Sequence, residues 1–363
     1  MRLIVLDENF DTIGSIPLFR TLIWLRRYNQ PGCFELYVSK DFFNMLDSGR
    51  YLYRNDANEL GVIGEVNYSQ DENGDREAYA KGYFAEILLH DRVIEKTVTL
   101  TGNIETVMRG LVARKAISPE DGERAVKHLR LGSVSGLPEV LEIQVTGDNL
   151  GEKLYDIGNA HEVSHRIRYD YLTNDLVFEV WQGKDRRDTQ EVNSWAVFSN
   201  SFYNIRNVTY NRNTSSYKNF AYVAGDGEGT GRVVITVDLR QPGEERKELY
   251  VDARDLQQED GDGNRIPDEV YRAQLVQRGK EKLSEFRKVE TVSIGIDPNA
   301  NLVYKTDFDL GDYCTYINTE IGIATDQRIT EVMETYEGGA MELSVTFGTD
   351  ETSTIKQLIK REV

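Results

Sequence analysis

The sequence IRYDYLTNDLVFEVWQG at residues 167–183 predicts an antiparallel β-hairpin. Apolar and aromatic residues alternate with charged residues from Ile167 to Tyr171, which is typical of a strand with one buried face. Thr173-Asn174-Asp175 is a polar turn, and residues 176–183 form a second strand-like run that can pair with the first. The middle of the chain is therefore expected to contain β structure.

The segment that precedes this hairpin has helical spacing. Apolar residues recur at intervals of three and four along residues 104–112, which predicts an amphipathic helix. Ser118-Pro119-Glu120-Asp121 offers a capping hydroxyl, a proline and two acids, and it predicts the start of a second helix. A third helix is expected from about residue 149 to Gly158-Asn159, because glycine commonly ends a helix.

The two ends of the chain read as β structure. Strand-like runs such as 22–27 and 33–38 fill the N-terminal part, and a short helix is expected over 83–91 after a strand. Beyond the hairpin, strands continue to residue 347 and are interrupted by one long helix over about 267–285. The patterns predict an α+β, β-rich fold in which two β regions flank a helical insertion.

Composition excludes several classes of protein. The 363 residues include 43 Lys and Arg against 61 Asp and Glu, a net charge of −18. A nucleic-acid binder needs clustered cations, and an anionic membrane surface would repel this chain, so stable binding to either is not expected. We find no apolar run of about 20 residues and no signal peptide. The only cysteines, Cys33 and Cys314, are far apart, which fits a reducing compartment.

Residues 161–165, His-Glu-Val-Ser-His, match the H-E-x-x-H pattern of zinc peptidases. In such a site both imidazoles lie on one helix face, and the glutamate activates water. Here the preceding helix is expected to end near Gly158-Asn159, and the residues from Val163 onward alternate as in a strand. Such a strand would separate His161 from His165, so the pattern favours a coincidence at the entry of a strand.

Three other segments resemble binding sites. The loop Gly225–Gly231 is glycine-rich, but Asp226 and Glu228 would repel a phosphate, so we expect a flexible hairpin tip that orders against a neighbouring subunit. Asp260, Asp262 and Asn264 resemble the start of a calcium loop, although the following residues depart from that motif. Three acids at 307–312 could act in acid–base chemistry if buried, but Leu310-Gly311-Asp312 reads better as a turn.

Several segments, in order and spacing, resemble one family. They are Arg26-Arg27-Tyr28 with Pro31-Gly32 and Phe34-Glu35-Leu36; Lys81-Gly82-Tyr83 through Asp91-Arg92-Val93-Ile94; Trp181-Gln182-Gly183-Lys184-Asp185-Arg186 through Phe198-Ser199 to Val223-Ala224-Gly225; Arg278-Gly279-Lys280; and Leu310-Gly311-Asp312. The set resembles the tail-hub proteins of long-tailed bacteriophages and prophages, which are similar to the baseplate hub of contractile phages.

The resemblance implies two β-barrel modules related to the tail-tube protein, an inserted α/β module, and helices packed on the barrels. The expected boundaries are 1–98 for the first tube-like module, 99–190 for the insertion, and 191–363 for the second tube-like module with the long helix. Three copies would form a ring that leaves a channel for DNA. The role is structural, with no catalytic residue, cofactor or metal, and this chain would lack a lytic or fibre domain of its own.

The implied location is the virion tail tip, after assembly in the host cytoplasm. The implied partners are further copies, the adjacent tail-tube or distal-tail protein, and tip or fibre proteins, while DNA passes only as cargo.

A ring of acidic chains needs local charge complementation. Candidate residues for the subunit interface are Arg26, Arg27, Arg186, Arg187, Asp226 and Glu228, although ordinary surface pairs would explain the arginines equally well. Two other functions stay open: a zinc peptidase, and a carbohydrate- or surface-binding β-protein suggested by the 20 tyrosines.

Overall fold

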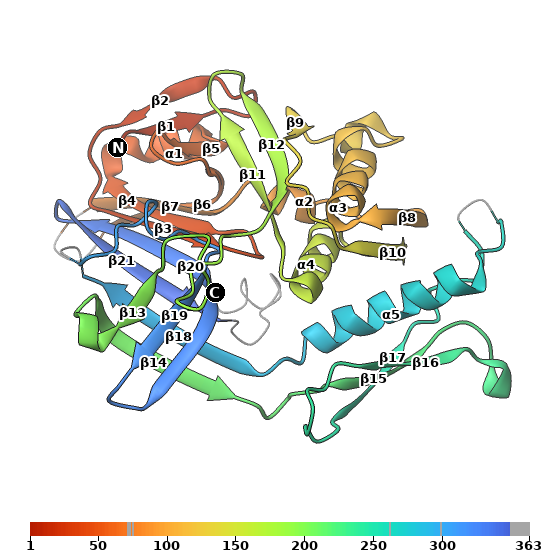
Figure 1. The fold of residues 1–363 in the computed structure, drawn as a ribbon. Coiled ribbons are helices and arrows are strands. Elements are labelled where there is room, and N and C mark those ends of the chain that lie inside the picture. The colour runs from red at the N-terminus through yellow and green to blue at the C-terminus, as the bar shows by residue number, and fades with distance from the viewer. Residues whose placement is uncertain (71–73, 75, 261–262, 298–299, 349–363) are drawn as a thin grey trace.

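The computed structural model describes residues 1–70, 74, 76–260, 263–297 and 300–348. The N-terminal region contains β1 Leu3–Leu6, β2 Thr12–Ile16, β3 Thr21–Arg27, β4 Cys33–Ser39, α1 Phe43–Ser48, β5 Tyr51–Arg54, β6 Leu60–Gln70 and β7 Arg76–Phe84. The C-terminal region contains β13 Val197–Ser199, β14 Ile205–Asn213, β18 Val289–Ile296, β19 Tyr313–Asn318, β20 Ile323–Glu337 and β21 Ala340–Phe347. Two smaller units project from these strands on the other side of the molecule (Figure 1).

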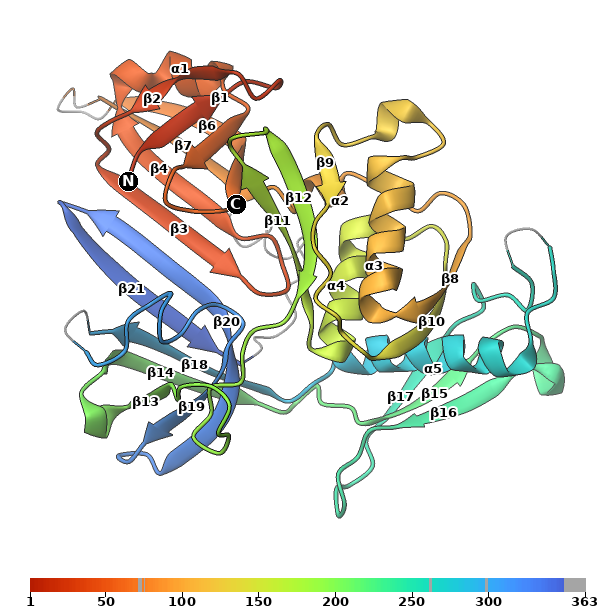
Figure 2. The same cartoon turned by 45° about the horizontal axis from the view of Figure 1, so that its top comes forward.

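The two β regions share one sheet of thirteen described strands. Its main path runs β14-β18-β21-β20-β3-β4-β7-β6-β5-β1-β2, and β19 pairs with β20 and β13. β20 pairs antiparallel with β3 from Glu331↔Arg27 to Glu337↔Thr21 (Figure 2). This pairing joins the C-terminal β region to the N-terminal β region. In β3, Leu22 and Trp24 are fully buried, as the alternating pattern of the sequence requires.

The β-rich α+β class is therefore confirmed. Within the described residues the main path begins at β14 and ends at β2 without closing on itself, so two closed barrels stay a prediction. β20 is the strand that serves both β regions, because its first half pairs with β19 and its second half with β21 and β3.

The inserted unit contains the predicted hairpin. It comprises α2 Ile87–His90, β8 Val98–Asn103, α3 Ile104–Val112, β9 Leu129–Leu131, β10 Val140–Val145, α4 Leu150–His161, β11 Ser164–Asp170 and β12 Asp175–Trp181. β11 and β12 pair antiparallel across the turn, which confirms the hairpin, and the α3 helix is also confirmed. Asn103 and Asn149 cap α3 and α4 through their side chains.

Three helix predictions in this unit were wrong in whole or in part. The helix predicted from Ser118 does not form: Asp121 caps a single 3-10 turn at Gly122–Arg124, and Leu129 then pairs with β12. The helix predicted over 83–91 is reduced to α2, because Phe84 remains in β7. The helix predicted to end at Gly158-Asn159 continues to His161, and Glu162 supplies the left-handed residue that ends it.

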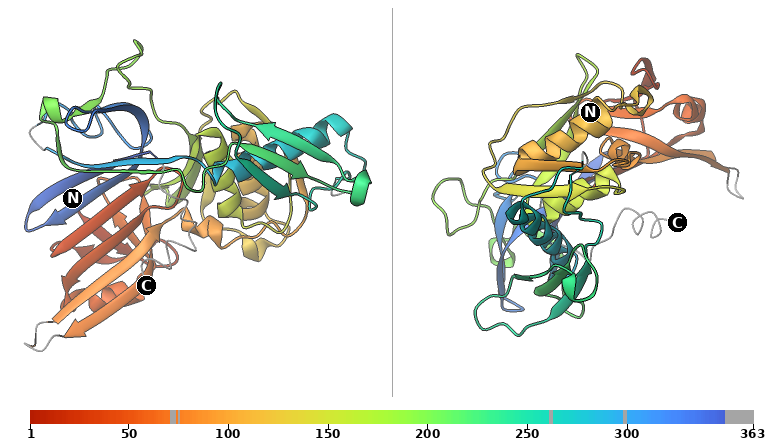
Figure 3. Two further views of the ribbon diagram at one scale, coloured as in Figure 1. Left: turned by 90° about the horizontal axis from the view of Figure 1, so that it is seen from below. Right: turned by 90° about the vertical axis from the view of Figure 1, so that its right-hand side faces the viewer.

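A second small unit interrupts the C-terminal region. It contains β15 Phe220–Ala224, β16 Val234–Asp238, β17 Glu248–Asp252 and the long helix α5 Asp268–Ser284. β15 pairs with β16 and β17, and α5 covers one face of this sheet (Figure 3). Gly279 allows the close approach, since a Cβ there would lie 2.6 Å from Val237 and 2.8 Å from Val223. The predicted long helix is confirmed, but it packs on this small sheet and on the insertion and not on the thirteen-stranded sheet.

The contact between α5 and α4 is polar. Lys153 donates to Glu281 at 2.6 Å with both side chains buried, and Asn159 donates to the Ser284 hydroxyl at 3.1 Å. Removing either partner of this buried ion pair would leave the other charge unpaired between the two helices.

Glu86 makes the stability of the insertion depend on pH. Its carboxyl is buried between the sheet and the hairpin and accepts one hydrogen bond, from the Ile167 amide at 2.8 Å. Burial raises the pKa of Glu86 to about 7, from an ordinary value of 4.5. A folded pKa above the unfolded one means that stability is highest below about pH 4.5 and is lost as pH rises through about 7.

Glu86→Gln should therefore raise the melting temperature at pH 8 and change it little at pH 4.5, because the amide keeps the acceptor and cannot ionise. Thermal melts at the two pH values, with the exposed Glu123→Gln as control, test this. Equal effects of Glu86→Gln at both pH values would contradict it.

Candidate assembly site

The motif segments noted in the sequence meet at one junction between the sheet, the hairpin and β19. Arg26 on β3 donates from Nη1 to Asp309 at 2.6 Å and to the Tyr304 hydroxyl at 2.8 Å, and from Nε to Glu59 at 2.7 Å. Burial would lower the pKa of Arg26, but these three partners raise it well above its ordinary value. The arginine is therefore a fixed cation inside the chain.

Two glycines allow the motifs to approach each other. A Cβ on Gly183 would lie 2.0 Å from the carbonyl carbon and oxygen of Gly311. Gly311 has a φ of +84°, and a Cβ there would lie 2.7 Å from both Trp181 and Tyr28. The Tyr28 and Trp181 rings meet edge to face at 5.1 Å. A side chain at position 183 would overlap the Gly311 backbone, and one at position 311 would overlap the rings of Trp181 and Tyr28. Both positions therefore need glycine for its small size.

Arg186 and Asp312 fix the chain that leaves this junction. The buried Arg186 guanidinium donates to Asp312 at 2.7 Å, and the Lys184 amide donates to the other oxygen of that carboxylate at 2.8 Å. The Arg186 carbonyl accepts from the Ala196 amide at 2.8 Å. This pairing sets the start of β13, which runs parallel to β19.

The candidate interface arginines are bound mainly within the chain. Arg26 and Arg186 are enclosed as described, and Arg27 donates to Glu331 at 3.0 Å on the neighbouring strand. Arg187 is partly exposed, stacks on Tyr313 at 4.8 Å, and is held by Asp185 at 2.6 Å. Their contact with a second copy stays a prediction, and Arg187 is the best placed of the four for it.

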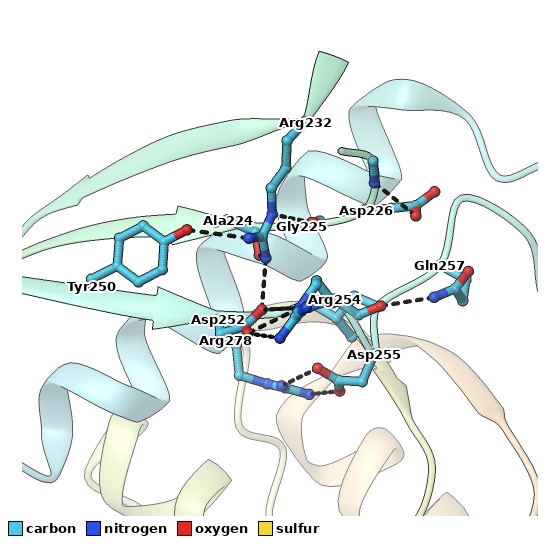
Figure 4. A network of polar contacts seen from close by, with 12 residues as sticks. Ala224, Gly225, Asp226, Arg232, Tyr250, Asp252, Arg254, Asp255, Gln257 and Arg278 are labelled. Carbon is cyan, nitrogen blue, oxygen red and sulfur yellow. Dashed lines mark hydrogen bonds and ion pairs between the residues drawn. The ribbon is translucent and has the colours of Figure 1, made fainter. Parts of the chain in front are cut away.

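Asp226 and Glu228 lie at one end of the small unit. Asp226 follows Gly225, whose carbonyl accepts from Arg232 Nε at 2.9 Å, and Arg232 also binds Asp252 at 2.6 Å (Figure 4). Glu228 is exposed and precedes the 3-10 turn η5 Gly229–Gly231. The loop base is therefore anchored by Arg232, and Glu228 near the tip is available to a partner.

The other sequence patterns are not assembled into catalytic or metal sites by the described residues. His161 ends α4 and bonds to Glu139 at 2.7 Å and Gln277 at 2.9 Å, whereas His165 is buried in β11, where burial lowers its pKa to about 3. Across the part of the chain that the structure describes, no group of three His, Cys, Asp or Glu side chains could hold a metal ion.

The remaining acidic patterns are held by internal hydrogen bonds. Asp260 accepts from the Asn264 amide at 2.8 Å, and Asp262 lies outside the described residues. Asp309 and Asp312 are bound by arginines, and the Asp307 carboxylate accepts from the Val303 amide at 2.8 Å. No helix among the described residues is long and apolar enough to cross a membrane.

Sequence reasoning missed the ion pair that joins the two β regions. Arg54 on β5 and Glu334 on β20 lie 2.6 Å apart, with 1% and 2% of their side chains exposed. Arg54 also lies over the rings of Trp24 and Tyr336, at 5.1 and 5.5 Å. Because 280 residues separate the two partners, no local pattern could have indicated this pair.

The fold is that of phage and prophage tail proteins. Similar structures include a tail protein from Neisseria meningitidis MC58, with a TM-score of 0.58, 13% identity and 96% coverage of both chains. Prophage tail protein gp18 from Listeria monocytogenes EGD-e gives a TM-score of 0.57 at 13% identity, over 100% of this chain and 98% of that one. The 43 kDa tail protein of prophage MuSo2 from Shewanella oneidensis gives 0.55 at 11% identity, over 96% and 98%.

The chain belongs to the family of siphovirus ReqiPepy6 Gp37-like proteins, which matches residues 2–349. No sequence among curated proteins is a significant match. The family and the tail-protein fold confirm the expected resemblance to siphophage and prophage tail proteins over nearly the whole chain.

Proposed function

We propose that this protein is a structural tail hub, which forms a trimeric ring between the tail tube and the tip or baseplate and leaves a channel for DNA. The observation that carries the proposal is the single sheet in which β20 joins both β regions. Such a sheet holds the two β regions of each copy in a fixed relation, so three copies would present six β regions to a six-fold tube.

The charge supports passage of DNA and not its retention. With −18 per chain, a ring of three copies carries a large negative charge, and a lumen lined by such chains would repel phosphates. Arg26 and Arg186 are bound to carboxylates inside the chain, so they offer no cationic binding surface to DNA.

The proposed role is structural, without catalysis. A zinc peptidase would need His161 and His165 on one helix face, but they lie on α4 and β11. The proposed setting is the virion tail tip, after assembly in the host cytoplasm. The proposed partners are the adjacent tail-tube or distal-tail protein above the ring and tip or fibre proteins below it.

Native mass spectrometry together with zinc analysis tests this function. We expect a trimer of the 41.5 kDa chain without stoichiometric zinc. A zinc-bearing monomer that hydrolyses peptides, and whose zinc is lost on His161→Ala, would contradict the proposal.

A further inference from the structure

β13 is an edge strand of the C-terminal region. Among the described strands it pairs only with β19, in parallel, from Val197↔Thr315 to Ser199↔Ile317. Its outward backbone groups are bonded within the chain, because the Asn204 side chain accepts from the Ser199 amide and donates to the Val197 carbonyl, so a contact on this side is made by side chains. β13 is fixed at its start by the Arg186–Asp312 pair, so this edge is held rigidly by the junction described above.

Large apolar side chains are exposed at both ends of this strand. We call them the β13 surface: Val192 (90% exposed), Trp195 (57%), Phe202 (56%), Tyr203 (85%) and Ile321 (54%). Phe202 and Tyr203 belong to η4 Asn200–Phe202 and its end, and Ile321 lies in the adjoining turn between β19 and β20. The Tyr203 and Ile321 segments adjoin, because the Thr319 amide donates to the Asn200 side chain at 3.2 Å, and exposed apolar groups on adjoining segments mark an interaction surface.

The segments that carry the β13 surface are held in place by hydrogen bonds within the chain. The buried Asn204 accepts from the Ser199 amide at 2.8 Å and donates to the Val197 carbonyl at 2.9 Å. Trp195 Nε1 donates to the Gln190 carbonyl at 2.7 Å. Tyr203 has a φ of +54°, a left-handed conformation that is costly for an aromatic residue and here directs its ring to solvent.

The distribution of charged residues along the chain indicates which surface could pack against the β13 surface. Residues 192–205 contain no charged side chain, and this is the longest uncharged run in a chain that is 29% charged. Three runs of eight residues come next, and one of them, Thr12–Phe19, contains β2, the strand at one end of the main sheet path. Ile13 is 39% exposed and Leu18 is 77% exposed on that β2 edge. Copies that repel one another through a charge of −18 approach most closely where charge is absent.

We propose that the β13 surface of one copy packs on the β2 edge of the next copy. β13 and β2 belong to the two different β regions, at the lower and upper left of Figure 1, so the contact joins two different surfaces and can close a ring by rotation. This inference rests on the proposed trimeric hub and names the surfaces that would form it.

Single substitutions on each surface test the contact. Tyr203→Asp places a charge on the β13 surface, and Leu18→Asp places one on the β2 edge. Asp tolerates the left-handed backbone conformation of residue 203. Each should weaken self-association at least about thirtyfold, the effect of losing an interface hot spot. Leu172→Asp is the matched control: Leu172 is 93% exposed at the tip of the β11–β12 hairpin and should leave the assembly unchanged. Circular dichroism should show all three variants folded.

Mixing the two variants gives a sharper result. Each carries one intact surface that matches the intact surface of the other, so an equimolar mixture should form dimers but no rings in analytical ultracentrifugation. Trimers that survive both substitutions would contradict this contact and leave the proposed ring standing. Loss of trimers in the Tyr203→Asp variant with trimers retained in the Leu18→Asp variant would also contradict it, because β2 would then not be the partner. A wild-type chain that stays monomeric would instead contradict the proposed ring itself.

Discussion

Arg54→Ala should lower the free energy of unfolding by about 3–5 kcal/mol, the cost of leaving a buried charge without its partner. Arg54 is the cation that binds Glu334 inside the seam between β5 and β20. Burial would raise the pKa of Glu334, but Arg54 and Lys305 hold it below its ordinary value. Without Arg54 the buried Glu334 carboxylate keeps Lys305 at 3.3 Å and the Tyr336 hydroxyl but loses the cation from β5, so the contact between the two β regions weakens.

Denaturant unfolding followed by tryptophan fluorescence measures this effect, since Trp24 lies beside Arg54. Arg206→Ala is the control, because Arg206 pairs with Asp297 with 55% of its side chain exposed, and such pairs contribute under about 1 kcal/mol. The double variant Arg54→Met with Glu334→Leu should be more stable than Arg54→Ala, because it buries no unpaired charge. Equal losses for Arg54→Ala and Arg206→Ala would show that the seam does not depend on this pair.

Gly183→Ala should cost about 3 kcal/mol or more, at the upper end of what overpacking costs. The added carbon would lie 2.0 Å from the Gly311 backbone, which cannot rotate away as a side chain can. The junction would have to open, and the Arg186–Asp312 pair that positions β13 would separate. We expect a lower melting temperature together with faster proteolysis of residues 184–196.

Gly122→Ala is the matched control for this substitution. A Cβ at Gly122 would meet nothing within 4 Å, so the variant should be neutral or up to about 1 kcal/mol more stable. A Gly183→Ala protein as stable and as resistant to protease as Gly122→Ala would remove the physical reason given for the Trp-Gln-Gly motif.

Local patterns predicted the elements of this fold well. The hairpin at 167–183, α3 and α5 follow from side-chain periodicity, which the surroundings do not override. The capping sequence at Ser118 failed because Gly122 and the pairing of Leu129 with β12 draw the chain into a turn and a strand. A cap signal specifies a helix only when the following residues also favour one.

Pairing between distant segments could not be predicted. β3 and β20 lie about three hundred residues apart, and neither sequence indicates its partner. Because distant partners are not visible in the sequence, Arg26 and Arg186 were predicted as interface residues. In the structure their side chains bind Asp309 and Asp312 within the chain. The uncharged run at 192–205 was visible in the sequence, but its exposure on an edge strand became apparent only from the fold.

Electron microscopy of the purified protein tests the central claim most directly. We expect closed three-fold rings with a central opening, with β13 of each copy beside β2 of the next. Particles that are single copies at every concentration, or closed assemblies without an opening, would contradict a hub through which DNA passes.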